Sequence, residues 1–245
     1  MNEMMRCMKS HVSVRSFTEQ PIEQELLKQI LGCGQAASSS SFIQAYSVIQ
    51  VLDEEKRKLI ARAAGNQRWI VKAAEFLVFC ADMQRIQYCC DKQGQGELQG
   101  FTEHFMTATI DTALMAQNVM LAAESIGLGG VFIGGIRNDP QTVSESLQLP
   151  NYVYPAFGMC LGWPAQQGDP KPRFPLKGIL HQDSYETGNI SQQVDEYDQQ
   201  MAAYYAGRDA NAKTTNWSQQ TAEAVQGKTR EHMLEFLQRR GFLRR

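Results

Sequence analysis

A long segment, residues 101–126, constrains the fold of this chain more than any other feature. Its apolar residues cover most of the circumference of the helix that they predict: Phe105, Ala108, Ala113, Met115, Ala116, Val119, Met120 and Ala123. Such a helix is typical of a protein core or a membrane span. Because Asp111, Gln117, Asn118 and Glu124 interrupt it, we expect a helix buried within a protein and no membrane-spanning segment.

Four short apolar runs predict strands against which this helix can pack. They are AYSVIQVLD (45–53), EFLVFCAD (75–82), VFIGG (131–135) and YPAFGMCLGW (154–163). The second run is apolar throughout, which favours a central strand.

Further helices are expected around these strands. Their apolar spacing and start signals place them at 2–9, 22–37 (with Pro21 at its first position), 54–65, from Asp139-Pro140, near 192–206, and at the C-terminus, where one helix ends in RRGFLRR. Helices predominate over about four strands, so the predicted fold class is α+β. We expect one domain over residues 1–245, with a core at 1–190 and a C-terminal helical extension at 191–245.

Charge and cysteine content exclude several classes of function. The 24 basic and 26 acidic residues give a net charge of −2, which is too balanced to favour nucleic acid or a membrane surface. The first residues, MNEMMRCMKS, have no signal-peptide core, so we expect a cytoplasmic protein. The six cysteines form no CxxC motif and the four histidines are scattered, so we expect reduced thiols and no metal site.

The glycine-rich stretch GLGGVFIGG, residues 127–135, does not fit a dinucleotide-binding fingerprint. That motif requires a strand before the glycines and a helix after them, whereas here a helix precedes and a strand follows. Gly134 and Gly135, at the end of the predicted strand, would allow a flat ligand to approach the backbone, although a glycine pair is also common in turns.

Polar residues elsewhere suggest an anionic ligand. His11, Ser13 and Arg15 alternate with valines, so a strand would place all three on one face. Lys171 and Arg173 flank a proline and suit a phosphate, or form a solvated basic turn. The serines at 38–41 offer hydroxyl donors, or end the preceding helix. These patterns alone indicate an anionic, flat ligand, with a nucleotide as one candidate.

Several motifs together resemble the FMN-dependent nitroreductase superfamily, and its larger, NADPH-preferring branch in particular. They are HxSxRSFTxxPI, AASSSSFIQAYSVI, GNQ at 65–67, AAESIGLGGVFIGGIRN, LGWP and KPR, and they extend from residue 10 to the final RGF. The resemblance implies an α+β fold with a central mixed or antiparallel sheet flanked by helices. It also implies an intertwined homodimer with two FMN sites, each built from both chains, in which the partner covers the long helix.

The resemblance also implies a set of FMN-binding residues. These are His11, Val12, Ser13, Arg15, Ser39, Ser40, Ser41, Gln67, Phe132, Ile133, Gly134, Gly135, Lys171 and Arg173. In this assignment Lys171 and Arg173 hold the phosphate, and Gln67 bonds the pyrimidine edge. The serines contact ribityl and phosphate oxygens from the partner chain of the dimer. The backbone N–H of Gly134 or Gly135 reaches the flavin N5 atom.

The implied NADPH and substrate residues lie mostly near the C-terminus. Arg208 corresponds to an arginine that binds the NADPH phosphate, Lys213 takes a position usually held by arginine, and Arg230 lies near nicotinamide and substrate. Phe42 would form a wall of the substrate pocket, and Glu103 corresponds to a glutamate near the flavin. The implied mechanism needs no protein acid or base, because the cofactor carries the chemistry, and Glu103 is the one candidate for such a role.

The implied activity is a ping-pong, NADPH-dependent, two-electron reduction of nitroaromatics, quinones and related acceptors. Alternatives within this class are an NADPH:flavin reductase and an azo or chromate reductase. A flavin-binding carrier without turnover is an alternative of another class, although Arg208 and Arg230 would be superfluous in it. Two departures matter: Val12 replaces a usual arginine, which predicts weaker FMN retention, and Lys213 predicts an NADPH preference relaxed toward NADH.

Overall fold

The structure, a computed structural model, describes residues 1–166, 168–207, 213–227 and 229–245. It contains two compact units, described separately below. The first comprises Met1–Gly168 and Arg230–Arg245, and the second comprises Asp169–Thr229. The chain thus leaves the first unit and returns to it, a different division from the predicted boundary at residue 190.

The first unit is built on a four-stranded antiparallel sheet in the order β1-β2-β4-β3. The strands are β1 (Tyr46–Gln50), β2 (Glu75–Asp82), β3 (Gly129–Ile133) and β4 (Val153–Gly162). Every residue of β2 is buried, which confirms the prediction of a central strand. The third strand was predicted to include Gly134 and Gly135, and this is wrong: β3 ends two residues earlier, at Ile133, and the chain turns into a 3-10 helix, η2 (Gly134–Asn138).

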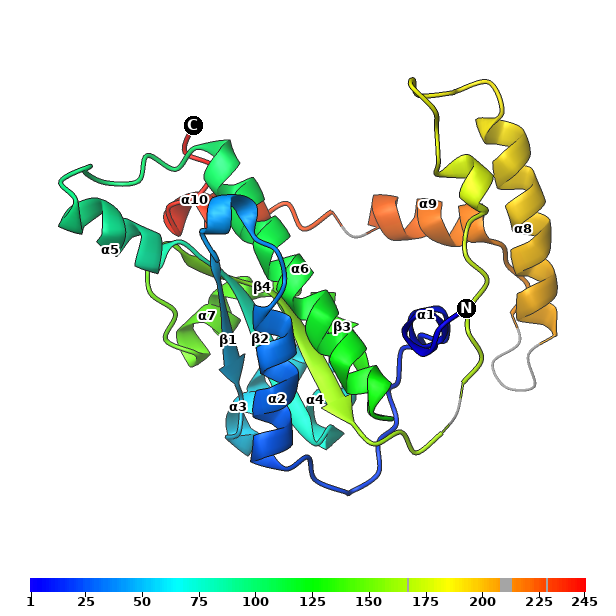
Figure 1. Ribbon diagram of the computed structural model, residues 1–245, viewed down its shortest axis with the longest axis horizontal. Coiled ribbons are helices and arrows are strands. Elements are labelled where there is room, and N and C mark those ends of the chain that lie inside the picture. Colours follow the sequence, from blue (N-terminus) through cyan, green and yellow to red (C-terminus); the bar gives the residue numbers. More distant parts are fainter. Residues whose placement is uncertain (167, 208–212, 228) are drawn as a thin grey trace. The chain divides into compact units, whose positions relative to one another are not determined.

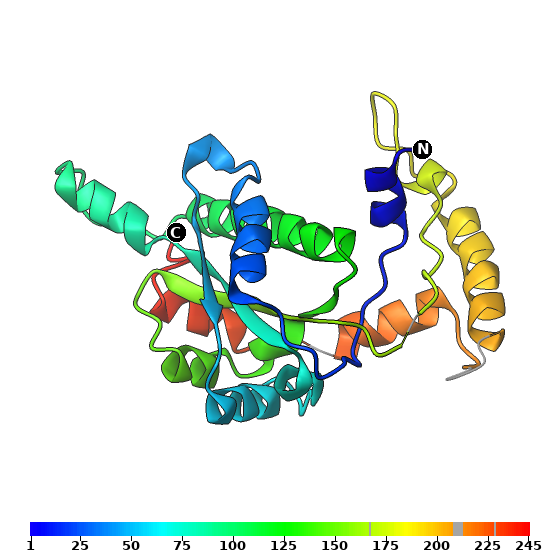
Figure 2. The same cartoon turned by 60° about the horizontal axis from the view of Figure 1, so that its bottom comes forward.

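Two long helices cover one face of this sheet, as Figures 1 and 2 show. They are α6 (Thr102–Ser125) and α2 (Gln24–Gln35). Buried residues of α6, among them Met115, Val119 and Met120, pack with those of α2 and the sheet. The predicted long helix is confirmed. The predicted start of the second helix at Pro21 is wrong, because α2 begins three residues later, after Glu23 in extended backbone.

Shorter helices cover the opposite face of the sheet (Figure 2). They are α3 (Glu54–Ala63), α4 (Trp69–Lys72) and α7 (Pro140–Ser146). Asp53 and Asp139 cap α3 and α7, because each carboxylate accepts a hydrogen bond from a backbone N–H three residues on. The predicted Asp-Pro helix start is therefore confirmed.

The C-terminal helix, α10 (Met233–Arg239), completes the core of the first unit. Phe236, Leu237 and Phe242 are buried against Tyr154 and other residues of the sheet and α6. Two further helices belong to this unit, α1 (Glu3–Lys9) and α5 (Gln84–Lys92), the latter projecting from the end of β2 in Figure 1.

The second unit consists mainly of two helices, α8 (Ile190–Ala206) and α9 (Trp217–Gly227), with a short 3-10 turn, η3 (Leu176–Gly178). Rings of Phe174, Tyr197 and Trp217 pack against one another and form its small core. The prediction of one last helix running to the C-terminus is wrong. It is two helices, α9 and α10, and the left-handed backbone of Arg230, with φ of 43°, lies between them.

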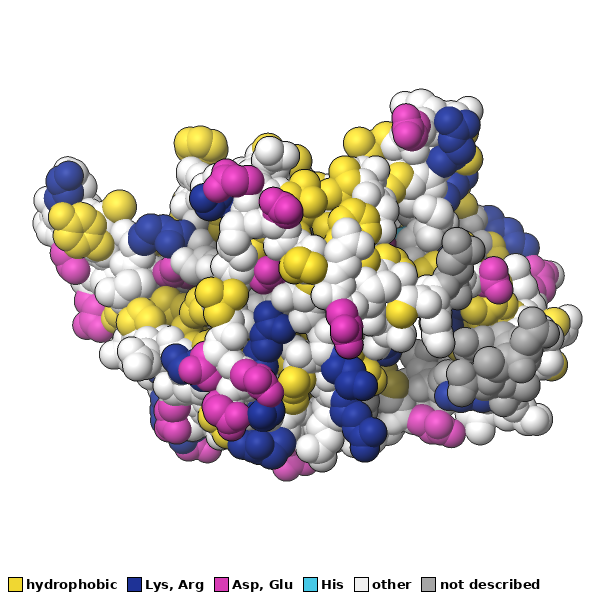
Figure 3. Space-filling model, turned by 90° about the horizontal axis from the view of Figure 1, so that it is seen from below, with side chains coloured by type: hydrophobic (Ala, Val, Ile, Leu, Met, Phe, Trp, Pro, Cys, Tyr) yellow, Lys and Arg dark blue, Asp and Glu magenta, His cyan; other side chains and the backbone are white. Residues whose placement is uncertain are grey.

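Charged side chains of both signs are mixed on the surface, in keeping with the small net charge of the chain. Acidic and basic side chains are interspersed over the face drawn in Figure 3. Among the residues that the structure describes, no helix is long and apolar enough to cross a membrane.

Candidate functional site

The N-terminal candidate residues lie in an extended segment beside the start of β3. Ser13 forms an isolated bridge with Gly130, and the Val14 N–H donates to the Gly130 carbonyl at 2.9 Å. A side chain on Gly129 would overlap Val14, with its Cβ 2.5 Å from a valine methyl. The segment is therefore held close to β3 without forming a regular strand.

His11 is held by a residue that the sequence did not single out for the site. Its Nδ1 lies 2.5 Å from Oε1 of Glu124, near the end of α6. The two side chains are 27% and 12% exposed. Glu124 is one of the polar interruptions of the long apolar helix, and that interruption was the available signal.

A continuous chain of contacts joins three of the predicted FMN residues. The Arg15 guanidinium lies over the Trp69 ring, with Cζ 5.7 Å from the centroid. Trp69 Nε1–H donates to Gln67 Oε1 at 3.1 Å, and Gln67 Nε2–H donates to the Ala64 carbonyl at 2.9 Å. A Cβ on Gly135 would lie only 2.2 Å from Gln67 Nε2. Arg15, Gln67 and Gly135 are thus brought together, with Trp69 as a residue that sequence reasoning missed.

The end of β3 presents backbone and one aromatic side chain. Phe132 is 36% exposed and meets the Phe157 ring edge to face, with centroids 5.5 Å apart. Ile133 is buried, so its side chain belongs to the core. Gly134 lies against Arg137, because a Cβ there would be 3.3 Å from the guanidinium.

Arg137 and Arg230 collect positive charge beside these glycines. Arg230 Nε–H donates to Asn138 Oδ1 at 3.0 Å, and Arg137 Nη1–H donates to the Ala156 carbonyl at 2.5 Å. Burial and then the neighbouring Arg230 lower the pKa of Arg137. None of the ion pairs in the described part of the chain involves either guanidinium. Arg137 was not among the predicted site residues.

The predicted serines lie in a tight loop between α2 and β1. The Ser40 N–H donates to the carboxylate of Asp111 at 2.8 Å. Ser41 and Phe42 have left-handed backbone, with φ of 48° and 58°, and Phe42 is 82% exposed. The Ser39 Oγ atom is buried and has no hydrogen-bond partner among the described residues, so it is available to a ligand.

The predicted phosphate-binding residues lie in the second unit. The Lys171 ammonium is 5.4 Å from the centroid of the Tyr205 ring, and the Lys213 N–H donates to the Tyr205 carbonyl at 3.3 Å. Burial raises the pKa of Tyr197, and the positive charge of Arg173 acts on this pKa in the opposite direction. Arg208 lies outside the described residues.

Val12 and Glu103 lie apart from these contacts. Val12 is half-buried beside Gly168, where an added Cβ would be 2.8 Å from a valine methyl. Glu103 is exposed in the first turn of α6 and meets Thr107 Oγ1 at 3.5 Å. No hydrogen bond, ion pair or ring contact described for these two residues joins them to the predicted flavin residues.

Comparison with known proteins identifies the family. The model of the nitroreductase family matches residues 8–163, and that of the C-terminal domain of the same family matches residues 171–245. The chain belongs to the nitroreductase family.

Named relatives of this family share much of their sequence with this chain. The chain is 43% identical to the NADPH-flavin oxidoreductase of Vibrio harveyi, covering 100% of both chains. It is 40% identical to the oxygen-insensitive NADPH nitroreductase of Salmonella typhimurium, covering 96% of each. The solved structure of NADPH:FMN oxidoreductase from Vibrio harveyi complexed with NAD+ matches at a TM-score of 0.90 and 41% identity, covering 100% of both chains.

Proposed function

We propose that this protein is an NADPH-dependent FMN oxidoreductase that reduces nitroaromatics, quinones and related acceptors by two electrons. Family membership and the activities named for the Vibrio and Salmonella relatives support this function. The structural observation that carries the proposal is the contact chain from Arg15 through Trp69 and Gln67 to Gly135. It brings together a cation, an amide and a glycine backbone.

The residues of the first unit fit a flat, anionic cofactor. Gly135 has no room for a side chain, so glycine at this position lets Gln67 and Ala64 pack directly against the backbone that follows β3. Ser39 Oγ is a buried polar atom that still needs a partner. Among the residues that the structure describes, the Arg15 guanidinium contacts Trp69 and makes one long hydrogen bond, of 3.4 Å, to the Ser13 carbonyl, so further donors remain for a ligand.

Each residue then has a defined task. Arg15 supplies positive charge where the reduced ring gains negative charge, and Gln67 offers an amide to the ring edge. The Glu124 carboxylate accepts from His11 Nδ1–H, which leaves the opposite ring nitrogen of His11 for the ligand. When bound, FMN accepts hydride from NADPH and passes two electrons to an acceptor.

Two features of the first unit support the NADPH and acceptor assignments. Phe42 offers an apolar wall, and Arg230 with Arg137 offers unneutralised positive charge to an anionic nucleotide or acceptor. A flavin carrier without turnover would not need this second cationic group in addition to Arg15. Lys171, Arg173, Arg208 and Lys213 remain predicted contacts with the phosphates of the cofactor and NADPH.

We also propose that the protein forms a homodimer. One side of α6 exposes Met106, Ile110 and Leu114, which are 47%, 48% and 43% exposed. These positions are four residues apart, so they form one apolar stripe. An apolar stripe on a long helix supports a partner surface.

The test of this function is NADPH oxidation by the FMN-loaded protein under anaerobic conditions, with nitro, quinone, azo, flavin and chromate acceptors compared. We expect turnover with nitro and quinone acceptors and a higher kcat/KM for NADPH than for NADH. The flavin reductase alternative, favoured by the name of the Vibrio harveyi relative, predicts the highest kcat/KM with free FMN. No turnover with any acceptor would contradict both.

A further inference from the structure

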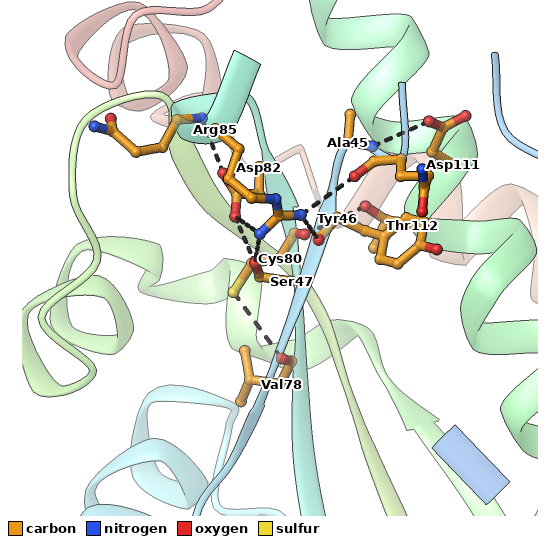
Figure 4. A network of polar contacts seen from close by, with 11 residues as sticks. Ala45, Tyr46, Ser47, Val78, Cys80, Asp82, Arg85, Asp111 and Thr112 are labelled. Atoms are coloured by element: carbon orange, nitrogen blue, oxygen red, sulfur yellow. Dashed lines mark hydrogen bonds and ion pairs between the residues drawn. The ribbon is translucent and has the colours of Figure 1, made fainter. Parts of the chain in front are cut away.

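Asp111 is a buried carboxylate that holds both ends of residues 40–45, which we call the serine loop. Its side chain on α6 is fully buried. Oδ1 accepts a hydrogen bond from the Ser40 N–H at 2.8 Å, and Oδ2 accepts one from the Ala45 N–H at 3.1 Å. Figure 4 shows the carboxylate beside Ala45. None of the ion pairs in the described ranges involves Asp111, so these two backbone donors offset the cost of burying its charge.

The segment between Ser40 and Ala45, the two residues that Asp111 anchors, has an unfavourable backbone conformation. Ser41, Phe42 and Gln44 all have positive φ values, of 48°, 58° and 55°. Residues other than glycine rarely adopt this region, and such strain persists only where surrounding structure imposes it. Phe42 is 82% exposed, so packing of its own ring does not impose the conformation. The loop is therefore held in shape by its anchors.

Arg85 on α5 holds the C-terminal end of the same loop. One of its nitrogens donates to the carbonyls of Gln44 at 3.2 Å and Tyr46 at 2.5 Å. The other donates to Asp82 at 3.1 Å and to Ser47 at 2.9 Å, as Figure 4 shows. These contacts fix only the exit of the loop. Asp111, in contrast, bonds both its entry and its exit.

We propose that Asp111 is a positioning residue for the cofactor and acceptor site. By holding Ser40 and Ala45 it imposes the strained loop, which presents the hydroxyls of Ser39 and Ser41 to the cofactor and Phe42 to the acceptor. This inference rests on the proposed FMN site. It adds that the site depends on a carboxylate from the buried face of α6, which makes no contact with the ligand itself.

The test compares Asp111→Asn with a matched control, Thr112→Val, in the full-length protein. Thr112 is the next residue, is equally buried, and its hydroxyl donates to the Ala108 carbonyl at 2.6 Å and to the Cys80 carbonyl at 3.4 Å, away from the loop. Three experiments are made on each variant: amide hydrogen exchange at Ser40 and Ala45, a titration that gives the Kd for FMN, and steady-state kinetics that give kcat and KM for 1,4-benzoquinone at saturating FMN.

For Asp111→Asn we expect exchange of both amides to accelerate and the Kd for FMN to rise by about tenfold or more, because charge-assisted hydrogen bonds are lost. KM for benzoquinone should rise more than kcat falls, since Phe42 is displaced while the cofactor chemistry is retained. Thr112→Val should change the exchange rates and the Kd by less than about twofold. Equal effects of the two substitutions would overturn the inference, because they would reflect damage to the core only.

Two further outcomes separate this inference from the proposed function. A wild-type protein that does not bind FMN overturns the proposed function. A wild-type protein that binds FMN, with an Asp111→Asn variant that binds it equally well, overturns the positioning role alone. If Asp111→Asn does not fold, amide hydrogen exchange in the wild-type protein tests whether Asp111 holds the loop. The Ser40 and Ala45 amides should exchange more slowly than the Gln44 amide, and equal rates would overturn the inference.

Discussion

At the residue scale, several residues of the proposed site have partners that lie far away in the sequence. His11 meets Glu124 and Ser40 meets Asp111, and both acidic residues come from the same helix. The sequence showed these acids only as polar interruptions of an apolar pattern. Their partners could not be predicted from local spacing, because the pairs are 113 and 71 residues apart. Trp69 and Arg137 were missed because their contacts with Arg15 and with the Ala156 carbonyl cannot be read from local spacing either.

Gly135→Ala tests the close approach at the centre of the site. The added Cβ would lie 2.2 Å from Gln67 Nε2 and 2.5 Å from the Ala64 carbonyl, and the carbonyl belongs to the backbone and cannot move freely. We expect the free energy of unfolding to fall by about 1–3 kcal/mol, as for other overpacked sites. FMN affinity should fall with it, because Gln67 is displaced.

The control is Gly32→Ala in α2, where an added Cβ meets nothing within 4 Å. Alanine is the better helix former by about 1 kcal/mol, so this variant should be as stable as the wild type or more so. Urea unfolding and fluorescence titration with FMN measure both quantities. Unchanged FMN affinity in Gly135→Ala would remove Gly135 from the proposed site.

At the scale of elements, the burial of α6 was predicted correctly, but the apolar residues that it leaves exposed were not predicted. Its apolar pattern predicted a helix covered on all sides, and its buried residues do pack against α2 and the sheet. Within one chain, however, Met106, Ile110 and Leu114 remain exposed. The apolar pattern of a sequence predicts which side chains of a helix are covered. It does not indicate whether the same chain or a partner covers them.

Ile110→Glu therefore tests the proposed dimer. A charge in the middle of the apolar stripe would have to be buried without a partner, so the dimer dissociation constant should rise by about a hundredfold or more. Analytical ultracentrifugation measures it, with Leu52→Glu as the control because Leu52 is an exposed apolar residue away from α6, in the connection between β1 and α3. A dimer that tolerates Ile110→Glu but not Leu52→Glu would place the interface elsewhere.

The contact between β4 and α6 predicts a loss of stability at alkaline pH. Tyr154 OH lies 2.5 Å from Thr109 Oγ1, and burial raises the pKa of Tyr154 to about 12. Because the pKa in the folded state exceeds the ordinary value of about 10, the contribution is complete below pH ~10 and is lost as the pH rises through about 12. The stability advantage over Tyr154→Phe should shrink by about 1.4 kcal/mol between pH ~8 and pH ~11.

Urea unfolding at both pH values measures this difference. Tyr88→Phe, which removes the hydroxyl of an exposed tyrosine, is the control and should differ from the wild type by a constant amount. A difference that is also constant for Tyr154→Phe would show that the buried hydroxyl does not couple folding to alkaline pH.

At the scale of the whole molecule, periodicity predicted the elements better than their connections. The α+β class, the four strands and the central position of β2 follow from apolar runs and are present. The return of the chain to the first unit could not be predicted, because it depends on Phe236 and Phe242 finding a core made by distant segments. The break between α9 and α10 was missed since arginine gives no sign of a left-handed backbone, which Arg230 adopts.

The central claim is that the cofactor site passes electrons from NADPH to an acceptor. The most direct measurement is the absorption spectrum of the FMN-loaded protein under anaerobic conditions. NADPH alone should remove the oxidised-flavin band, and subsequent addition of 1,4-benzoquinone should restore it. A band that persists after NADPH is added would contradict the proposed oxidoreductase function.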